Sequence, residues 1–222
     1  MEVQKQDPFH EILEFAIMVV WMGLAFGIFF AGGLNAFKDL VVLRTSIMES
    51  LVVVFFAFVL HELAHRIAAR RYGFHAVFHV WIPGLMLAMG GALIGLLFAA
   101  PGGVYIQAQN TVENRAKLGK SALVGPVVNM VLGVIFAVVT LVFIAFIQSY
   151  TTGTGASLEA ASWVKTVEEI GVMGLEINAL LAFFNLIPWG FFDGFKVFQW
   201  NKKVWIIAFI SAILLFLLTF FV

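Results

Sequence analysis

The chain has 222 residues, of which 62% are hydrophobic and 12% are charged, and its mean hydropathy is +1.02. Soluble domains are roughly 45–50% apolar and about 25% charged, so this composition excludes an ordinary soluble domain and a disordered chain. Thirteen basic and 13 acidic residues give zero net charge, which leaves no basic surface to hold nucleic-acid phosphates.

Five long apolar segments follow one another and predict an all-α, multi-spanning membrane protein with a single domain over residues 1–222. Uncharged apolar runs of about 18 or more residues are typical of membrane spans. The N-terminal residues are too acidic, and the first apolar run is too long, for a signal peptide. A polar stretch at 148–165 predicts a solvated loop. The predicted spans are Phe15–Leu34, Ile47–Ile67, Ala122–Ile147, Ile170–Ile187 and Val204–Val222.

The apolar segment Trp81–Ile106 is long enough to span but is rich in helix breakers. It contains Pro83, Pro101 and six glycines, a density that disfavours a straight helix even in lipid. We predict a re-entrant segment, with a β-hairpin as one form that it can take, buried against the rest of the protein. A plain sixth span is the alternative.

Basic residues flank this segment on both sides and determine the predicted orientation. Basic loops favour the cytoplasmic face of a membrane, so the segment is expected to enter and leave on that face. The N-terminus is then cytoplasmic and the C-terminus is outside, in a multi-pass protein of the cell membrane. Lys38 and Arg44, in the predicted first outer loop, count against this orientation. The residues that favour it are Arg66, Arg70, Arg71, Arg115, Lys117, Lys120, Lys196, Lys202 and Lys203.

The predicted second span ends in the sequence HELAHRIAARRYG, and ionisable residues in a span are usually functional. His61 and His65 are four residues apart, so they project from one helix face and can bind one Zn²⁺. Glu62 lies beside them, where it can take a proton from zinc-bound water. The pattern predicts a zinc site with Glu62 as catalytic base. Alternatively, the three side chains line an aqueous cavity or a proton path.

A catalytic zinc site usually has a third protein ligand. The chain has no cysteine and three aspartates, of which Asp7 and Asp39 lie outside the predicted spans. Asp193 lies in NLIPWGFFDGF, after the helix-breaking Pro188 and level with His61 in the predicted topology. We predict Asp193 as the third ligand. Its alternative role is to cap the helix that follows.

These residues resemble the signatures of site-2 proteases, which are intramembrane zinc metalloproteases. The resemblance covers a core of about residues 47–200, and the motifs occur in the family's order. The matching motifs are HELAHRIAARRYG at 61–73, NLIP at 185–188 followed by Asp193–Gly194, and GPxxN from Gly125 to Asn129.

The resemblance implies one Zn²⁺ per chain, held by His61, His65 and Asp193, with Glu62 as the base. It also implies that the segment ending in PGGV at 101–104 is the family's re-entrant region near the active site. No PDZ or CBS regulatory domain is expected.

The implied activity is hydrolysis of peptide bonds in or near transmembrane segments of membrane-protein substrates, at the cytoplasmic side. Asn129 and Asn185 are expected either to bind substrate or an oxyanion, or to join helices. A prenyl-protein protease is one alternative and would take its third ligand from a later glutamate. A transporter or an ion or proton channel that uses the His, Glu and Asp cluster is another. The later glutamates are Glu159, Glu168, Glu169 and Glu176.

Overall fold

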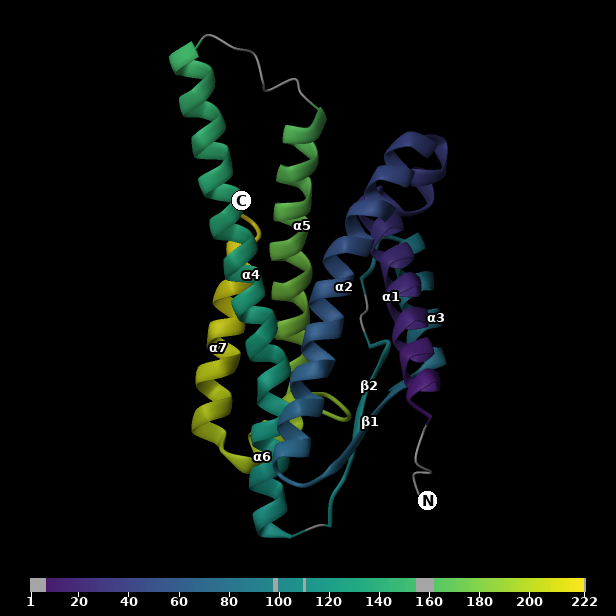
Figure 1. Ribbon diagram of the computed structural model, residues 1–222, viewed down its shortest axis with the longest axis vertical. Coiled ribbons are helices and arrows are strands. Elements are labelled where there is room, and N and C mark those ends of the chain that lie inside the picture. The colour runs from purple at the N-terminus through teal and green to yellow at the C-terminus, as the bar shows by residue number, and fades with distance from the viewer. Residues whose placement is uncertain (1–6, 98–99, 110, 155–161, 222) are drawn as a thin grey trace.

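The computed structural model describes residues 7–97, 100–109, 111–154 and 162–221. Long helices run side by side, and a two-stranded sheet lies near one end of the bundle (Figure 1). The elements, in chain order, are α1 (Pro8–Phe30), the 3-10 helix η1 (Gly33–Lys38), α2 (Leu40–Arg71), β1 (His75–Val80), α3 (Ile82–Leu93), β2 (Gly102–Gln107), α4 (Val112–Thr154), α5 (Ser162–Asn185), α6 (Asp193–Trp200) and α7 (Lys202–Leu218).

Helix α2 carries the predicted histidines and is longer than the apolar run in its sequence. Asp39 caps its N-terminus by accepting hydrogen bonds from two backbone N–H groups at 3.0 and 3.1 Å. The apolar run ends at Leu60, but the helix continues to Arg71 because the polar residues that follow are compatible with helix. Gly73, with φ +80°, then ends the helix in the left-handed conformation.

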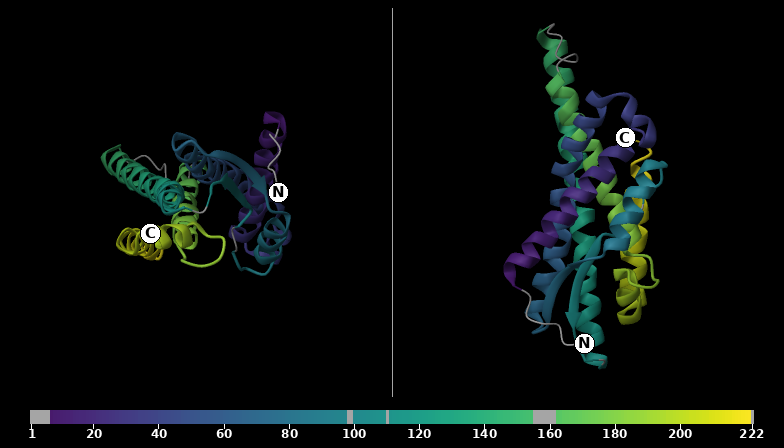
Figure 2. Two further views of the ribbon diagram at one scale, coloured as in Figure 1. Left: turned by 90° about the horizontal axis from the view of Figure 1, so that it is seen from below. Right: turned by 90° about the vertical axis from the view of Figure 1, so that its right-hand side faces the viewer.

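Helix α2 lies between two groups of helices, as Figure 1 and the left view of Figure 2 show. Helix α1 packs on one side of it, with α3 against α1, and α4, α5 and α7 lie on the other side. The main apolar core joins α1, α2, α3, β1 and α5, while smaller clusters join α4 and α5 to α7. The core side chains that are fully buried include Met18, Met22, Phe26, Val53, Val54, Phe78, Ile177 and Leu181.

Strands β1 and β2 pair antiparallel, with Phe78 opposite Val104. The outer edge of β1 is closed by two carboxylates of α1. The Phe78 N–H donates to Glu11 at 3.1 Å, and the Val80 N–H donates to Glu14 at 3.0 Å. The other edge of the sheet, that of β2, is open in the sense that no further strand among the described residues pairs with it.

The segment Trp81–Ile106 turns back on itself. The Trp81 N–H donates to the carbonyl of Pro101 at 2.8 Å, so the chain returns to the point where the segment began. Helix α3 has 12 residues and so is about 18 Å long, which is less than a hydrocarbon core of about 30 Å. The prediction of a partly β segment needs correction in detail, because β1 precedes the segment and a helix joins the strands. Re-entry into a membrane stays a prediction.

Among the described residues, α1, α2 and α4 are long and apolar enough to cross a membrane. Helix α7 has 17 residues, and α5 contains four charged residues, so the count of five spans stays a prediction. The polar loop expected at 148–165 is shorter than predicted. Helix α4 continues to Thr154 and α5 begins at Ser162, because polar residues without proline do not stop a helix. Residues 155–161 lie outside the described part of the chain.

Candidate metal centre

Two histidines of α2 direct the same ring nitrogen toward one point. His61 and His65 lie one turn apart on one helix face, and their Nε2 atoms are 2.9 Å apart. Both side chains are buried, with exposed fractions of 4% and 5%. Two imidazole nitrogens that meet in this way provide half of a tetrahedral metal site.

Asp193 reaches the histidines because the chain reverses between α5 and α6. Helix α5 ends at Asn185, three residues before Pro188, whose ring cannot continue a helix. Gly190 has φ +61°, a conformation that glycine adopts without strain. Asp193 is the first residue of α6, and the residue is 8% exposed.

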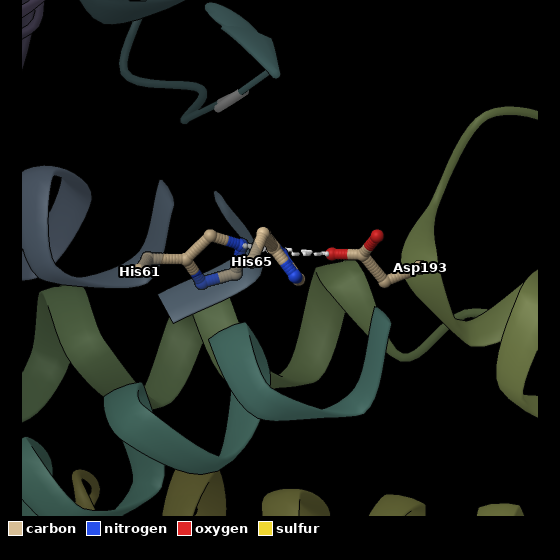
Figure 3. A group of neighbouring side chains, drawn as sticks. All are labelled: His61, His65 and Asp193. Atoms are coloured by element: carbon tan, nitrogen blue, oxygen red, sulfur yellow. Dashed lines mark hydrogen bonds and ion pairs between the residues drawn. The ribbon is translucent and has the colours of Figure 1, made fainter. Parts of the chain in front are cut away.

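The three side chains form a compact set of ligand atoms (Figure 3). Oδ2 of Asp193 lies 2.8 Å from Nε2 of His65 and 3.6 Å from Nε2 of His61. Ligands that bind Zn²⁺ at about 2.1 Å in a tetrahedron are about 3.4 Å apart. The observed spacing therefore needs only small side-chain shifts to receive such an ion, and the donor set of two imidazoles and a carboxylate suits zinc.

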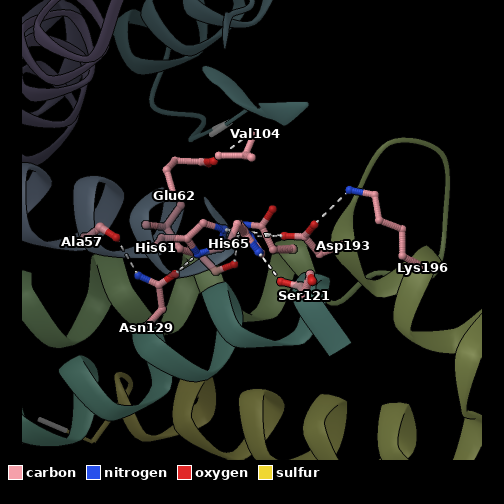
Figure 4. Close-up of polar contacts among 11 residues, drawn as sticks. Ala57, His61, Glu62, His65, Val104, Ser121, Asn129, Asp193 and Lys196 are labelled. Carbon is pink, nitrogen blue, oxygen red and sulfur yellow. Dashed lines mark hydrogen bonds and ion pairs between the residues drawn. The ribbon is translucent and has the colours of Figure 1, made fainter. Parts of the chain in front are cut away.

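The other nitrogen of each imidazole is held by a hydrogen-bond acceptor (Figure 4). Nδ1 of His65 donates to the backbone carbonyl of Ser121 at 2.7 Å. Nδ1 of His61 donates to Oδ1 of Asn129. With its proton on Nδ1, each neutral ring presents the lone pair of Nε2 to a metal. These contacts fix the tautomer and the direction of both rings.

Asn129 is fully buried, and both ends of its carboxamide are engaged. Besides the contact with His61, its Nδ2 donates to the carbonyl of Ala57 at 3.0 Å and to Oδ1 of Asn178 at 2.8 Å. It thus joins α2, α4 and α5 beneath the histidines. Of the two roles expected for Asn129, these contacts favour the joining of helices, and they add an orienting contact with His61.

Gly125, in α4, lies directly against the histidine pair. A Cβ atom placed there would contact Nε2 of His65 and would lie 2.7 Å from Nε2 of His61. Glycine therefore allows α4 to approach the Nε2 atoms of both histidines, which could hold a metal ion. The GPxxN pattern thus supplies two contacts to the site, Gly125 against the ligand nitrogens and Asn129 behind one ring.

Gly125→Ala is expected to lower zinc affinity at least tenfold, because the methyl group displaces both imidazoles; even changes behind the ligands have effects of about this size. Alanine favours helix by about 1 kcal/mol relative to glycine, so the fold should persist. Zinc titration of the purified variant measures the effect. The control is Gly133→Ala, a change at another glycine of α4. Its Cβ would lie 3.1 Å from a methyl group of Leu215 in α7, away from the histidines. Full zinc affinity in Gly125→Ala would contradict the role given to this glycine.

Glu62 lies beside the ligand group at the wall of a cavity of about 580 Å³. The residue is 6% exposed, and its carboxylate accepts a hydrogen bond from the Val104 N–H at 3.0 Å. Strand β2 forms one wall of the cavity, and α6 and the loop before it form another. Asn185 also lines the cavity and donates to the carbonyl of Leu181 at 3.0 Å, which leaves both of its expected roles open.

The second oxygen of Asp193 contacts a cation. Nζ of Lys196 lies 3.3 Å from Oδ1, on the side away from the histidines. Burial raises the pKa of the Asp193 carboxyl, but His65 and Lys196 lower it more, so this pKa lies well below its usual range. The ionised carboxylate is the form that binds a metal.

The structure brings the predicted base, Glu62, together with the three predicted ligands, and it adds contacts that sequence reasoning missed. The carbonyl of Ser121 and the side chain of Asn178 belong to no motif, so no sequence signal could have found them. Val104 belongs to the PGGV motif, which predicted that its segment lies near the site but did not indicate the contact of its N–H with Glu62. The rival third ligands lie elsewhere. Glu168, Glu169 and Glu176 line a separate cavity of about 430 Å³, and Glu159 falls outside the described residues.

Comparison with known proteins agrees with a metal site. No protein-family model matches the chain, and no solved structure matches it. A protein of Methanocaldococcus jannaschii, named "Putative zinc metalloprotease", is 38% identical over 160 residues, which cover 72% of this chain and 73% of that protein. At this identity and coverage, the chain belongs to the family of that archaeal zinc metalloprotease.

Proposed function

We propose that this protein is an intramembrane zinc metalloprotease of the site-2 type. Its cofactor is zinc, and His61, His65 and Asp193 are the proposed ligands. The convergence of these three ligand atoms beside Glu62, on a helix that is long and apolar enough to cross a membrane, carries the proposal.

In the proposed reaction, Glu62 is the general base. Bound zinc supplies Lewis acidity, which activates water and polarises a carbonyl. Glu62 accepts the proton of the attacking water and passes it to the leaving amine. Asn129 and the Ser121 carbonyl keep the imidazoles oriented through Nδ1. Lys196 holds the second oxygen of Asp193.

The proposed substrate is a transmembrane segment of another protein. A helix uses its peptide groups in its own hydrogen bonds, so the segment must unwind locally before a peptide bond can be attacked. An extended chain can then pair with the open edge of β2. This edge lines the same cavity as Glu62 and the histidines, so the paired chain would lie across the ligand group.

In the proposed topology, the chain crosses the cell membrane five times and opens its active site toward the cytoplasm. Tyr72, after α2, and Val112, at the start of α4, are then on the same face. Val112 is 84% exposed and Tyr72 is 37% exposed, so both positions suit a label. Single cysteines there, in a chain with no cysteine of its own, should react with an impermeant thiol reagent from the same side. Reaction from opposite sides would contradict the re-entrant segment.

Metal content and cleavage together test the function. The purified protein is expected to hold about one zinc per chain and to cut a transmembrane substrate in proteoliposomes. Chelation should stop cleavage and added zinc should restore it, while His61→Ala should lose both metal and activity. A protein that binds no metal would contradict the proposal and would favour a transporter.

A further inference from the structure

The backbone N–H of Val104 is at the open edge of the sheet. Val104 faces Phe78 across the ladder, but the two residues exchange no hydrogen bond. The Phe78 N–H donates outward to Glu11, and the Val104 N–H donates outward to Glu62. Antiparallel pairs alternate in this way, so Gly102 and Ile106 also turn backbone groups toward the cavity.

Both edges of the sheet thus end on carboxylates, but these carboxylates differ in what they do. Glu11 and Glu14 belong to α1 and close the edge that faces away from the ligand group. On the open edge, the carboxylate is the proposed catalytic base itself. The N–H of Val104, which donates to this carboxylate, is one of the groups with which an added strand would form its hydrogen bonds.

We propose that the contact between Glu62 and Val104 is a latch that an extended substrate opens. This inference rests on the proposed function. A substrate strand pairs its own carbonyl with the Val104 N–H and displaces the Glu62 carboxylate, which is then free to turn toward water at the ligand group. The base is therefore released where and when a chain lies on β2.

When the substrate displaces Glu62 from Val104, each group that loses a hydrogen bond gains another. Glu62 is 6% exposed, so a donor must satisfy its carboxylate. At rest this donor is the Val104 N–H, and during reaction it is the attacking water. The substrate takes over the N–H and also gains the carbonyl of Val104 and the N–H of Ile106. A molecule that cannot pair with the strand does not open the latch and is cut slowly.

Two variants of Glu62 separate the latch from the chemistry. Gln keeps an oxygen that accepts from the Val104 N–H, whereas Ala removes it, and neither variant can act as base. Zinc-loaded Glu62→Ala should therefore bind a synthetic apolar peptide, kept extended by a central Gly-Pro pair, about fivefold more tightly than Glu62→Gln, the effect of one net hydrogen bond. Without peptide, the backbone amide hydrogen of Val104 should exchange with solvent at least fivefold faster in Glu62→Ala than in Glu62→Gln.

Val104→Pro is the control, because it removes the N–H at an open strand edge, where proline is tolerated. In this background, Glu62→Ala and Glu62→Gln should bind the peptide equally. A difference that persists would mean that side-chain size, not the hydrogen bond, controls binding, and it would overturn the latch. Equal affinities of the two Glu62 variants with Val104 present, or equal amide exchange, would also overturn it. These measurements involve no cleavage, so failure of the latch is distinct from failure of protease activity in the wild-type protein.

Discussion

Glu62→Gln is expected to abolish cleavage of a transmembrane substrate while zinc content stays at the wild-type level. The carboxamide has nearly the shape of the carboxylate and still accepts from the Val104 N–H, but it cannot take a proton from water. General-base catalysis contributes about 10²–10⁴-fold, so the rate should fall by at least a hundredfold. Glu62 lies outside the group of three ligands, so the metal should remain.

Two measurements on the same preparation check this result, the zinc content by elemental analysis and the rate of cleavage in proteoliposomes. Thermal unfolding of the variant provides the control for folding. If Glu62→Gln lost zinc while it remained folded, Glu62 would have to be a ligand, and the roles assigned to the residues of the HExxH motif would be wrong.

Asp193→Asn is expected to weaken zinc binding at least tenfold and to reduce cleavage with it. The carboxylate offers Oδ2 to the histidine nitrogens and Oδ1 to Lys196, and a neutral amide weakens both interactions. Even groups behind the ligands affect metal affinity by about 10- to 100-fold. Loss of the charge of a ligand should therefore lower zinc affinity at least tenfold. Competition with a zinc-specific chelator gives the change in dissociation constant.

Asp39→Asn is the matched control for that variant. Asp39 caps α2 at the end opposite the histidines, and asparagine caps helices as well as aspartate does. Zinc binding should be unchanged in Asp39→Asn. If Asp193→Asn kept full metal and full activity, the third ligand would have to be a different residue, and the assignment of Asp193 would be wrong.

Much of the candidate site was predictable because its information is local. The i, i+4 spacing of His61 and His65 places both rings on one face wherever the segment is helical. Asp193 lies 128 residues after His65 in the sequence, and it was identified because the chain has so few aspartates and through the resemblance to site-2 proteases. The structure agrees with the predicted grouping by placing Oδ2 within 3.6 Å of both nitrogens.

Other parts of the structure depend on contacts that no local pattern encodes. Hydropathy located α2 and α4, but it ended them too early, because a helix ends where its hydrogen bonds end and not where its residues become polar. β1 was missed because HAVFHV is short, and its pairing with β2 depends on the return of α3. The acceptors for the Nδ1 atoms of the histidines come from α4, and only packing shows them.

The acidic face of α1 also determines how separate molecules behave when they meet in a bilayer. An open strand edge tends to pair with a strand of another molecule, and lipid offers no water to compete for its backbone groups. Glu11 and Glu14 occupy the N–H groups of Phe78 and Val80 on β1, so these groups cannot pair with the sheet of a second copy and extend it into a ribbon. Replacing both glutamates by leucine would remove this protection, and the resulting protein should self-associate and lose activity as neighbouring molecules block one another.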